Sequence, residues 1–540
     1  MNTNLLKLSI ISIALPSIVF AKGEKPNIIF LLSDDIGVKE IPIYGSNEWY
    51  DYQTNRMVTD PNERSQTPVL DDMARKGCWI STCWACPVSM PSRAMLLSGR
   101  YAADQKWWYN RDIGDYQAEN GKQTDWPIYE SSPHTLASVA HDAGYATYWA
   151  GKTQMPNVEE SLLYGFDEGC YVGGRSKFSN FYLEKDDSVP SKGIMGSFRN
   201  ADAGNIVHSY AQTSTLWKPG VQLINYPGAD KAVIDYPHTE EQIANYGVNT
   251  YGPDIEMEFI LDFIERKKEE KKPFFIYHAS HLGHGAFNYL DPTKGDKLPP
   301  TPKLTWDGKK YIRTEPNITG EKGVYDAHGT ISEPGLGAHL AYLDYHLWVY
   351  TQKLKEIGEY ENTIFIFSGD NGTGGYGKGS AECQKGVNVP LVFYAPGMKL
   401  TKKGVQDIIM DYTDLLPTIA DIAGTELPED AQLEGKSLMP YLTTKKKEHR
   451  DFIYSYKAGL QLIRGTKVLR DGDGIWYDVE NIPANLDGFP KIIDWSTVSA
   501  EHRAERDKLE ALLPKYNLYY TEYNGPGGTG KPVMKAKNKK

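Results

Sequence analysis

The chain has 540 residues, of which 40% are hydrophobic, 24% charged and 12% aromatic, a composition typical of a globular protein. At this length roughly two to four domains are expected, although one large α/β enzyme can reach the same size. The formal net charge of −11 argues against nucleic acid as a partner, but it permits a local cationic site for an anionic substrate.

The N-terminal segment has the composition of a secretory signal. Lys7 provides the positive charge, residues 8–20 form an apolar run, and Val19-Phe20-Ala21 offers a cleavage site. No later run approaches the roughly 20 apolar residues that a membrane span requires. We therefore expect residues 1–21 to be a signal peptide, and the mature chain to be periplasmic or secreted without a membrane span.

Apolar runs typical of buried strands alternate with helical patterns between residues 27 and 394. This alternation favours an α/β fold, with a large mixed, mostly parallel sheet flanked by helices. The predicted strands cover residues 27–32, 145–149, 274–278, 363–368 and 389–394, and the predicted helices cover residues 67–76, 134–142, 254–267 and 338–357.

The pattern of apolar and polar residues changes after Leu442. Short alternating segments at residues 451–456, 460–464 and 475–479 predict a smaller C-terminal α+β subdomain. Before that point, residues 288–337 are rich in Pro, Gly, Lys and Thr and predict a long loop region. The expected division is a signal peptide over residues 1–21, a catalytic domain over 22–442, the subdomain over 443–524 and a disordered tail over 525–540.

The five cysteines leave at least one free thiol, because their number is odd. Cys83 and Cys86 have the spacing of a redox motif, but no thioredoxin-like context and no second pair for zinc accompanies them. We therefore expect structural cysteines, either buried or linked in disulfides.

One segment, Val88 to Arg100, combines the features of an oxyanion site. Pro91 suits the first turn of a helix, where its missing N–H costs nothing. Ser89 is then expected at a helix N-terminus, whose free N–H groups and dipole attract anions. Arg93 adds a fork of donors suited to sulfate, phosphate or carboxylate. The alternative is an ordinary Ser/Pro helix start with a surface arginine.

Polar residues follow four of the predicted strands, at the point where each strand ends. In open α/β sheets ligands bind outside the carboxyl ends of strands, so these residues are expected to converge. The carboxylate and amide oxygens among them suit Ca²⁺ or Mg²⁺ and favour Ca²⁺, although each pair alone also fits a plain turn. The residues are, in chain order, Asp34 and Asp35; Lys152; His278, His281 and His284; and Asp370 and Asn371.

The stretch from Ser89 to Gly99 resembles the signature of type I sulfatases, in which Cys or Ser is followed by any residue, Pro, any residue and Arg. Further stretches resemble that family in matching order over nearly the whole mature chain. The resemblance implies an alkaline phosphatase-like α/β fold and a sulfuric ester hydrolase. These further stretches are Pro26–Asp35, Thr67–Asp71, Phe367–Gly372, Asp411–Thr418 and Tyr477–Asn481.

The resemblance also implies the cofactors. In the family, the residue at the position of Ser89 is oxidised to formylglycine, an aldehyde whose hydrate attacks sulfur. A Ser rather than a Cys at this position implies a bacterial protein whose partner in biogenesis is an anaerobic sulfatase-maturing enzyme. The family's single Ca²⁺ is bound by residues that correspond to Asp34, Asp35, Asp370 and Asn371.

The same resemblance assigns the residues that bind and protonate the sulfate ester. Arg93, Lys152 and Lys378 correspond to the cations that neutralise sulfate. His284 corresponds to the histidine that contacts the leaving oxygen. The nearby rivals of His284 are His278 and His281.

The chain departs from the family at Gln154, where a histidine that helps to remove a proton is usual. A glutamine can hydrogen-bond but cannot act as a base at neutral pH, so the identity of the base stays open. The expected substrate is a sulfated carbohydrate. Trp107 and Trp108, and also His281, are candidates to line the sugar pocket, with core packing as the alternative for the two indoles.

The sequence also permits two other functions. A phosphatase or phosphodiesterase of the same superfamily would use unmodified Ser89, but it would need two metals and histidine ligands. No Asp-His-x-His element follows Asp370. A non-catalytic, glycan-binding member of the family is the second alternative, and Gln154 is its main support.

Overall fold

A computed structural model of the chain describes residues 25–51, 56–110, 112–117, 121, 123–154, 159–172, 183–185, 196–200, 206–209, 221–236, 252–284, 304–307, 311–313, 336–428, 431–482 and 484–517. The expected signal peptide, the expected disordered tail and most of the predicted loop region 288–337 lie outside these residues. Among the helices that are described, none is both long enough and apolar enough to cross a membrane.

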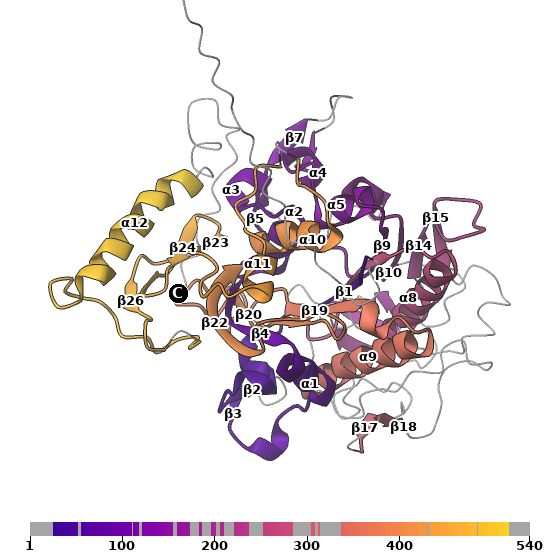
Figure 1. Ribbon diagram of the computed structural model, residues 1–540, viewed down its shortest axis with the longest axis horizontal. Helices are drawn as coiled ribbons and strands as arrows, with labels where there is room; N and C mark the ends of the chain where they lie inside the picture. Colours follow the sequence, from indigo (N-terminus) through magenta and orange to yellow (C-terminus); the bar gives the residue numbers. More distant parts are fainter. Residues whose placement is uncertain are drawn as a thin grey trace, which may run out of the picture.

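An eleven-stranded mixed sheet runs through the centre of the molecule (Figure 1). Its five central strands, β10, β9, β16, β1 and β19, are parallel, whereas the strands towards the edges pair largely antiparallel. The path is β15 (Val233–Tyr236), β14 (Val221–Ile224), β10 (Glu168–Val172), β9 (Ala146–Gly151), β16 (Phe274–Ala279), β1 (Asn27–Ser33), β19 (Thr363–Gly369), β21 (Leu391–Tyr394), β4 (Cys78–Trp84) and β20 (Asn388–Val389), with β22 (Gly404–Asp411) also paired to β4.

Both faces of this sheet are covered, because successive side chains of β1 enter different cores. Ile28, Phe30 and Leu32 pack with α2 (Ser89–Ser98), α5 (Leu136–Asp142) and α10 (Leu415–Ala423). Ile29 and Leu31 pack with α1 (Pro68–Lys76), α8 (Gly252–Glu269) and α9 (Leu336–Glu356). In Figure 1, α2 and α10 lie above the sheet and α1 and α9 below it. This double burial explains the continuous apolar runs of the central strands.

The register of the central strands brings their carboxyl ends level. Leu32 of β1 pairs with Ala279 of β16, and Ala279 in turn pairs with Gly151 of β9. On the other side, Ser33 of β1 pairs with Gly369 of β19. The polar residues that follow these strands in the sequence therefore emerge at one edge of the sheet.

The C-terminal part forms a separate four-stranded antiparallel sheet with a covering helix, coloured yellow in Figure 1. The strands are β23 (Ile453–Lys457), β24 (Leu460–Arg464), β25 (Val468–Arg470) and β26 (Trp476–Asp478), and the helix is α12 (Ala500–Tyr516). This arrangement confirms the prediction that the C-terminal part has an α+β structure. The division of the chain into domains at residues 442 and 524 stays a prediction.

The remaining elements are short. They are β2 (Trp49–Asp51), β3 (Arg56–Val58), β5 (Trp107–Tyr109), β6 (Asp112–Ile113), β7 (Asp115–Gln117), β8 (Gln123–Asp125), β11 (Leu183–Lys185), β12 (Gly196–Asn200), β13 (Ile206–Ser209), β17 (Leu304–Trp306), β18 (Tyr311–Arg313), α3 (Ala102–Gln105), α4 (Ile128–Ser131) and α11 (Met439–Thr443).

Candidate active site

Ser89 is the first residue of α2, as the proline in the following turn predicts. Its side chain is completely buried, and its Oγ donates a hydrogen bond to Asn371 Oδ1 at 2.9 Å. The helix thus points its N-terminus at the residues that follow β19. The fold thus brings the Ser89 hydroxyl into direct contact with the amide of Asn371. The first group was predicted from the helix-start motif and the second from the end of a strand.

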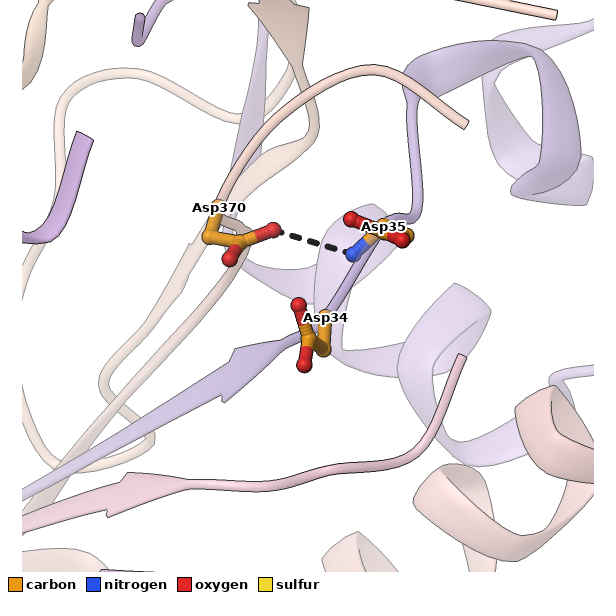
Figure 2. Close-up of side chains that lie close together, drawn as sticks. All are labelled: Asp34, Asp35 and Asp370. Atoms are coloured by element: carbon orange, nitrogen blue, oxygen red, sulfur yellow. Dashed lines mark hydrogen bonds between the residues drawn. The ribbon is translucent and has the colours of Figure 1, made fainter. Parts of the chain in front are cut away.

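Three buried carboxylates gather beside this contact, on Asp34, Asp35 and Asp370 (Figure 2). One oxygen from each lies within 4.8 Å of the others. The backbone N–H of Asp35 donates to Asp370 Oδ1 at 2.9 Å, the dashed line in Figure 2. Asp35 has a φ of 57°, a left-handed conformation that aspartate tolerates better than most residues.

This carboxylate cluster fits a hard divalent cation. Asn371 Nδ2 donates to Asp35 Oδ1 at 2.9 Å, so the amide lies against the three acids. Asp34 Oδ1 is buried and accepts no hydrogen bond within the described parts of the chain. Oxygen donors of this kind are those that Ca²⁺ prefers, and three buried negative charges require positive charge nearby. Asp34, Asp35, Asp370 and Asn371 are therefore suited to hold Ca²⁺.

Arg93 supplies one of those positive charges from the second turn of α2. The guanidinium is fully buried and donates from Nε and Nη2 to Asp370 Oδ2, at 3.2 and 2.9 Å. Its Nη2 also lies 3.6 Å from Asp34 Oδ1. Burial alone would lower the pKa of Arg93, but Asp370 and other groups outweigh it and raise the pKa, so the side chain stays charged.

Two lysines complete the cationic lining of the site. Lys152 directly follows β9 and forms an ion pair with Asp34 Oδ2, and Lys378 Nζ lies 2.7 Å from Asp35 Oδ2. Burial lowers the pKa of Lys152 more than Asp34 raises it. Burial also opposes the charge of Lys378, but Asp35 and Asp34 outweigh it and raise its pKa. An anion entering here meets Arg93 and both lysines.

The three candidate histidines after β16 occupy different places. His284 Nε2 lies 3.6 Å from Asp35 Oδ2, at the carboxylate cluster. His278 and His281 instead face Glu256, at 3.5 and 3.9 Å. Burial lowers the pKa of His284, and the charge of Asp35 opposes that effect. Of the three rings, His284 is thus the one whose contacts reach the cluster.

Gln154 lies two residues beyond Lys152, in a left-handed conformation with a φ of 50°. Its Oε1 is buried and has no hydrogen-bond partner among the described residues. The amide is therefore near the site in sequence, but no contact of its oxygen fixes a role for it.

Trp107 and Trp108 are both 0% exposed and belong to the core that packs on α2. Trp107 Nε1 donates to the backbone oxygen of Trp126 at 2.8 Å. The expectation that these indoles line a sugar pocket is therefore not met: they pack inside the protein, because aromatic area next to a buried helix is most stable there. All five cysteines are buried free thiols, not disulfides.

Glu256 was not singled out by the sequence reasoning. It lies on α8 between Ile255 and Met257, it is 1% exposed, and it faces two of the candidate histidines. The available signal was an acid between two apolar residues of a helix, at a position where a charge is costly to bury.

The chain is similar in sequence to known sulfatases. The sulfatase family model matches residues 26–425. Arylsulfatase A from Homo sapiens is 24% identical over 474 residues, which are 84% of this chain and 74% of that protein. The N-acetylglucosamine-6-O-sulfatase of Bacteroides thetaiotaomicron is 22% identical over 470 residues, 79% of this chain and 73% of that protein.

Solved structures show the same fold. A structure in complex with its substrate D-glucosamine-2-N,6-O-disulfate has a TM-score of 0.54 and 19% identity, and the match covers 93% of this chain and 99% of that one. A sulfatase from Pseudoalteromonas sp. has a TM-score of 0.56 and 18% identity, over 92% and 91% of the two chains. Because the family model matches well over half of its length, the chain belongs to the sulfatase family, and it is a sulfuric ester hydrolase with an alkaline phosphatase-like α/β fold.

Proposed function

We propose that this sulfatase removes sulfate from a sulfated carbohydrate, using a formylglycine made from Ser89 and one bound Ca²⁺. The observation that carries the proposal is the contact of Ser89 Oγ with Asn371, beside three buried carboxylates and three cationic side chains. The match to an N-acetylglucosamine-6-O-sulfatase and to a structure with a disulfated glucosamine supports a sugar sulfate as substrate.

The metal would be held by Asp34, Asp35, Asp370 and Asn371, whose oxygens meet in one buried cluster. A divalent cation there supplies positive charge for a sulfate oxygen. Arg93, Lys152 and Lys378 bind the remaining charge of the sulfate and the charge that grows on it as the ester bond breaks. Their fixed ion pairs orient these donors before substrate binds.

A formylglycine at position 89 would supply a hydrated aldehyde, with one hydroxyl as the nucleophile towards sulfur and a second whose ionisation would let sulfate depart. The N-terminus of α2 holds residue 89 against Asn371, which fixes the direction of its oxygen. His284, at the edge of the cluster and 23% exposed, is placed to donate a proton to the leaving sugar oxygen.

Two aspects of biogenesis belong to the same proposal. The serine at position 89 is converted by an anaerobic sulfatase-maturing enzyme, and the chain is exported to the periplasm or beyond. The support for both is the sequence: a Ser in the family signature, and the apolar run at residues 8–20.

The test uses protein made together with an anaerobic maturase. Mass spectrometry of the peptide containing Ser89 should show the loss of two hydrogens. Ser89→Ala should then lower the turnover of an aryl sulfate by roughly 10³-fold or more, because the nucleophile is gone.

Ser98→Ala is the matched control, because Ser98 lies in the same helix and its hydroxyl bonds only nearby backbone groups: it donates to the carbonyl of Ala94 and accepts from the backbone N–H of Arg100. It should keep the activity. Undiminished turnover by Ser89→Ala would contradict the proposal, and faster release of phosphate from the matching aryl phosphate would favour a phosphatase instead. A panel of sulfated monosaccharides and oligosaccharides would then identify the sugar.

A further inference from the structure

The loop that carries Lys378 begins at the carboxyl end of β19, directly after Asp370 and Asn371. Near the start of this loop, Thr373 is 1% exposed. Near its other end, Lys378 Nζ lies 2.7 Å from Asp35 Oδ2. A buried threonine and a cation of the site therefore belong to one short loop, and the contacts of the threonine bear on where the cation lies.

The backbone oxygen of Thr373 closes this loop into a turn. It accepts hydrogen bonds from the backbone N–H groups of Tyr376, Gly377 and Lys378, at 3.2, 2.7 and 2.9 Å. Backbone groups that are paired in this way hold the main chain in one conformation. The main chain of Lys378 is thus fixed relative to Thr373, and a contact that fixes Thr373 also fixes the point from which the lysine side chain starts.

The hydroxyl of Thr373 binds this loop to the segment that follows Asp34 and Asp35. The backbone N–H of Gly37 donates to Thr373 Oγ1 at 3.1 Å, and Oγ1 donates to Glu40 Oε1 at 3.1 Å. A Cβ built on Gly37 would lie 3.2 Å from Oγ1, so the two segments pack closely. The hydroxyl uses its one proton and a lone pair in these bonds, which are buried and therefore specific in direction.

Two bridges therefore join the loops at the ends of β1 and β19. One is the Thr373 hydroxyl on Gly37 and Glu40, and the other is the ion pair of Lys378 with Asp35. The two bridges differ in stiffness. A β-branched threonine has few rotamers, whereas lysine has a long flexible stem and loses much rotamer entropy when it is held in one place. The place of the ammonium group thus depends on the main chain that the threonine fixes.

We propose that Thr373 is a positioning residue for sulfate binding: its hydroxyl holds the loop so that the ammonium group of Lys378 lies beside the carboxylate cluster. Thr373 acts through the lysine. This inference rests on the proposed function, which assigns Lys378 to the sulfate, and extends it by naming the group that places this cation. A displacement of about 1 Å in such a group can cost up to roughly 100-fold in rate.

Thr373→Val tests this role, because valine keeps the shape of the side chain and removes the hydroxyl. Titration calorimetry with inorganic sulfate, on protein made without a maturase and in the presence of Ca²⁺, should show a dissociation constant raised about tenfold. Thr373→Ser keeps the hydroxyl and should restore the dissociation constant to within about threefold of the wild type. Unchanged sulfate binding by Thr373→Val would overturn the proposal.

A double-mutant cycle separates positioning of the lysine from a general loosening of the site. Lys378→Met alone should raise the dissociation constant for inorganic sulfate by about 10- to 100-fold, because a charged donor is lost. Adding Thr373→Val to Lys378→Met should then change it by less than about twofold, since the threonine acts through the lysine. If Thr373→Val weakens binding by the same factor with and without the lysine, the proposal is wrong.

Thr418→Val is the matched control. Thr418 is also 1% exposed, and its Oγ1 donates to the backbone oxygen of Asp414 at 2.6 Å and accepts from the backbone N–H of Leu438 at 2.9 Å. This control loses the same kinds of hydrogen bond, on α10, and should lower the melting temperature while leaving sulfate binding unchanged. Equal loss of sulfate affinity in both valine variants would mean that destabilisation alone is the cause, which would also overturn the proposal.

The arms of the experiment also distinguish this inference from the proposed function. Sulfate binding by Lys378→Met equal to that of the wild type would reject the role that the proposed function gives to the lysine, and this inference with it. Weaker binding by Lys378→Met but not by Thr373→Val would reject only the role of Thr373. If Thr373→Val does not fold, Thr373→Ala, which removes the same hydroxyl, takes its place in the cycle under the same criteria.

Discussion

Glu40 shows how strongly the environment of a single side chain sets its chemistry. The carboxylate is 2% exposed and accepts hydrogen bonds from the Tyr50 backbone and from Thr373 Oγ1, each at 3.1 Å. Burial raises the pKa of Glu40 to about 7, although these hydrogen bonds and Lys39 favour the charged form. A neutral acid is therefore held in the fold at moderately acidic pH.

The raised pKa of Glu40 predicts how the stability of the protein depends on pH. Because the folded pKa of Glu40 lies above the unfolded one, its contribution to stability is fully present below about pH 4.5 and is lost as pH rises through about 7. Glu40→Gln should remove that loss, so the variant should gain roughly 3 kcal/mol relative to the wild type between pH 4.5 and pH 8. Urea unfolding at several pH values measures this, and parallel pH curves of the two proteins would contradict it.

Individual residues also show what sequence reasoning can and cannot find. Ser89, Arg93 and Asp370 stand in short motifs whose chemistry is legible from residue type and spacing, and the structure places them together. Glu40 and Glu256 stand in no motif. Their properties come from burial by segments that are distant in sequence, so only the folded chain reveals them.

At the scale of elements, the end of β9 is built for close approach. A Cβ at position 151 would lie 2.3 Å from Ala279 O, in addition to the strain of a positive φ. Gly151→Ala should therefore destabilise the protein by about 1 to 3 kcal/mol and weaken the binding of inorganic sulfate, because Lys152 would be displaced. Urea unfolding and titration calorimetry measure the two effects.

Gly144→Ala separates the two causes, since Gly144 has a φ of 90° with nothing within 4 Å of the built Cβ. This control should lose stability through backbone strain alone and should bind sulfate normally. Equal sulfate binding by both variants would show that the end of β9 does not position Lys152.

Strands and helices were predictable from the sequence where residues within the segment itself determine the structure. The predicted strand at 27–32 is β1, and the predicted helix at 67–76 is α1 to within one residue. The run at 389–394 is instead divided at Pro390 into β20 and β21, because proline has no N–H for the sheet. Strands β4 and β22 were missed: β4 mixes Ser81 and Thr82 with apolar residues, and it is defined by partners more than 300 residues away.

At the scale of the whole molecule, Arg450 ties the C-terminal part to the main sheet. Its Nη1 donates to Asp411 Oδ1 at 2.8 Å and Asp414 Oδ1 at 2.9 Å, and its Nη2 donates to the Tyr101 hydroxyl at 2.9 Å. All of these groups are buried. Arg450 thus places one positive charge between two buried carboxyl groups, and His449 Nε2 lies 2.9 Å from Oδ2 of one of them, Asp414.

Arg450→Met should lower the free energy of unfolding by about 3 to 5 kcal/mol, because it leaves both carboxylates buried without this partner. Lys508→Met is the contrast, since its ion pair with Asp451 joins side chains that are 53% and 65% exposed. That change should cost less than about 1 kcal/mol. Guanidinium unfolding measures the stability of both variants. Similar losses of stability would mean that Arg450 does not stabilise the contact between the C-terminal part and the main sheet.

The burial of Ser89 has a consequence for the order of events in the life of the chain. Its hydroxyl has no exposed surface, and its hydrogen-bond partner, Asn371, is synthesised 282 residues later. A modifying enzyme can therefore reach this residue only while the chain is unfolded. Under the proposed function, folding and maturation therefore compete in time, and the active fraction of the protein depends on which is faster.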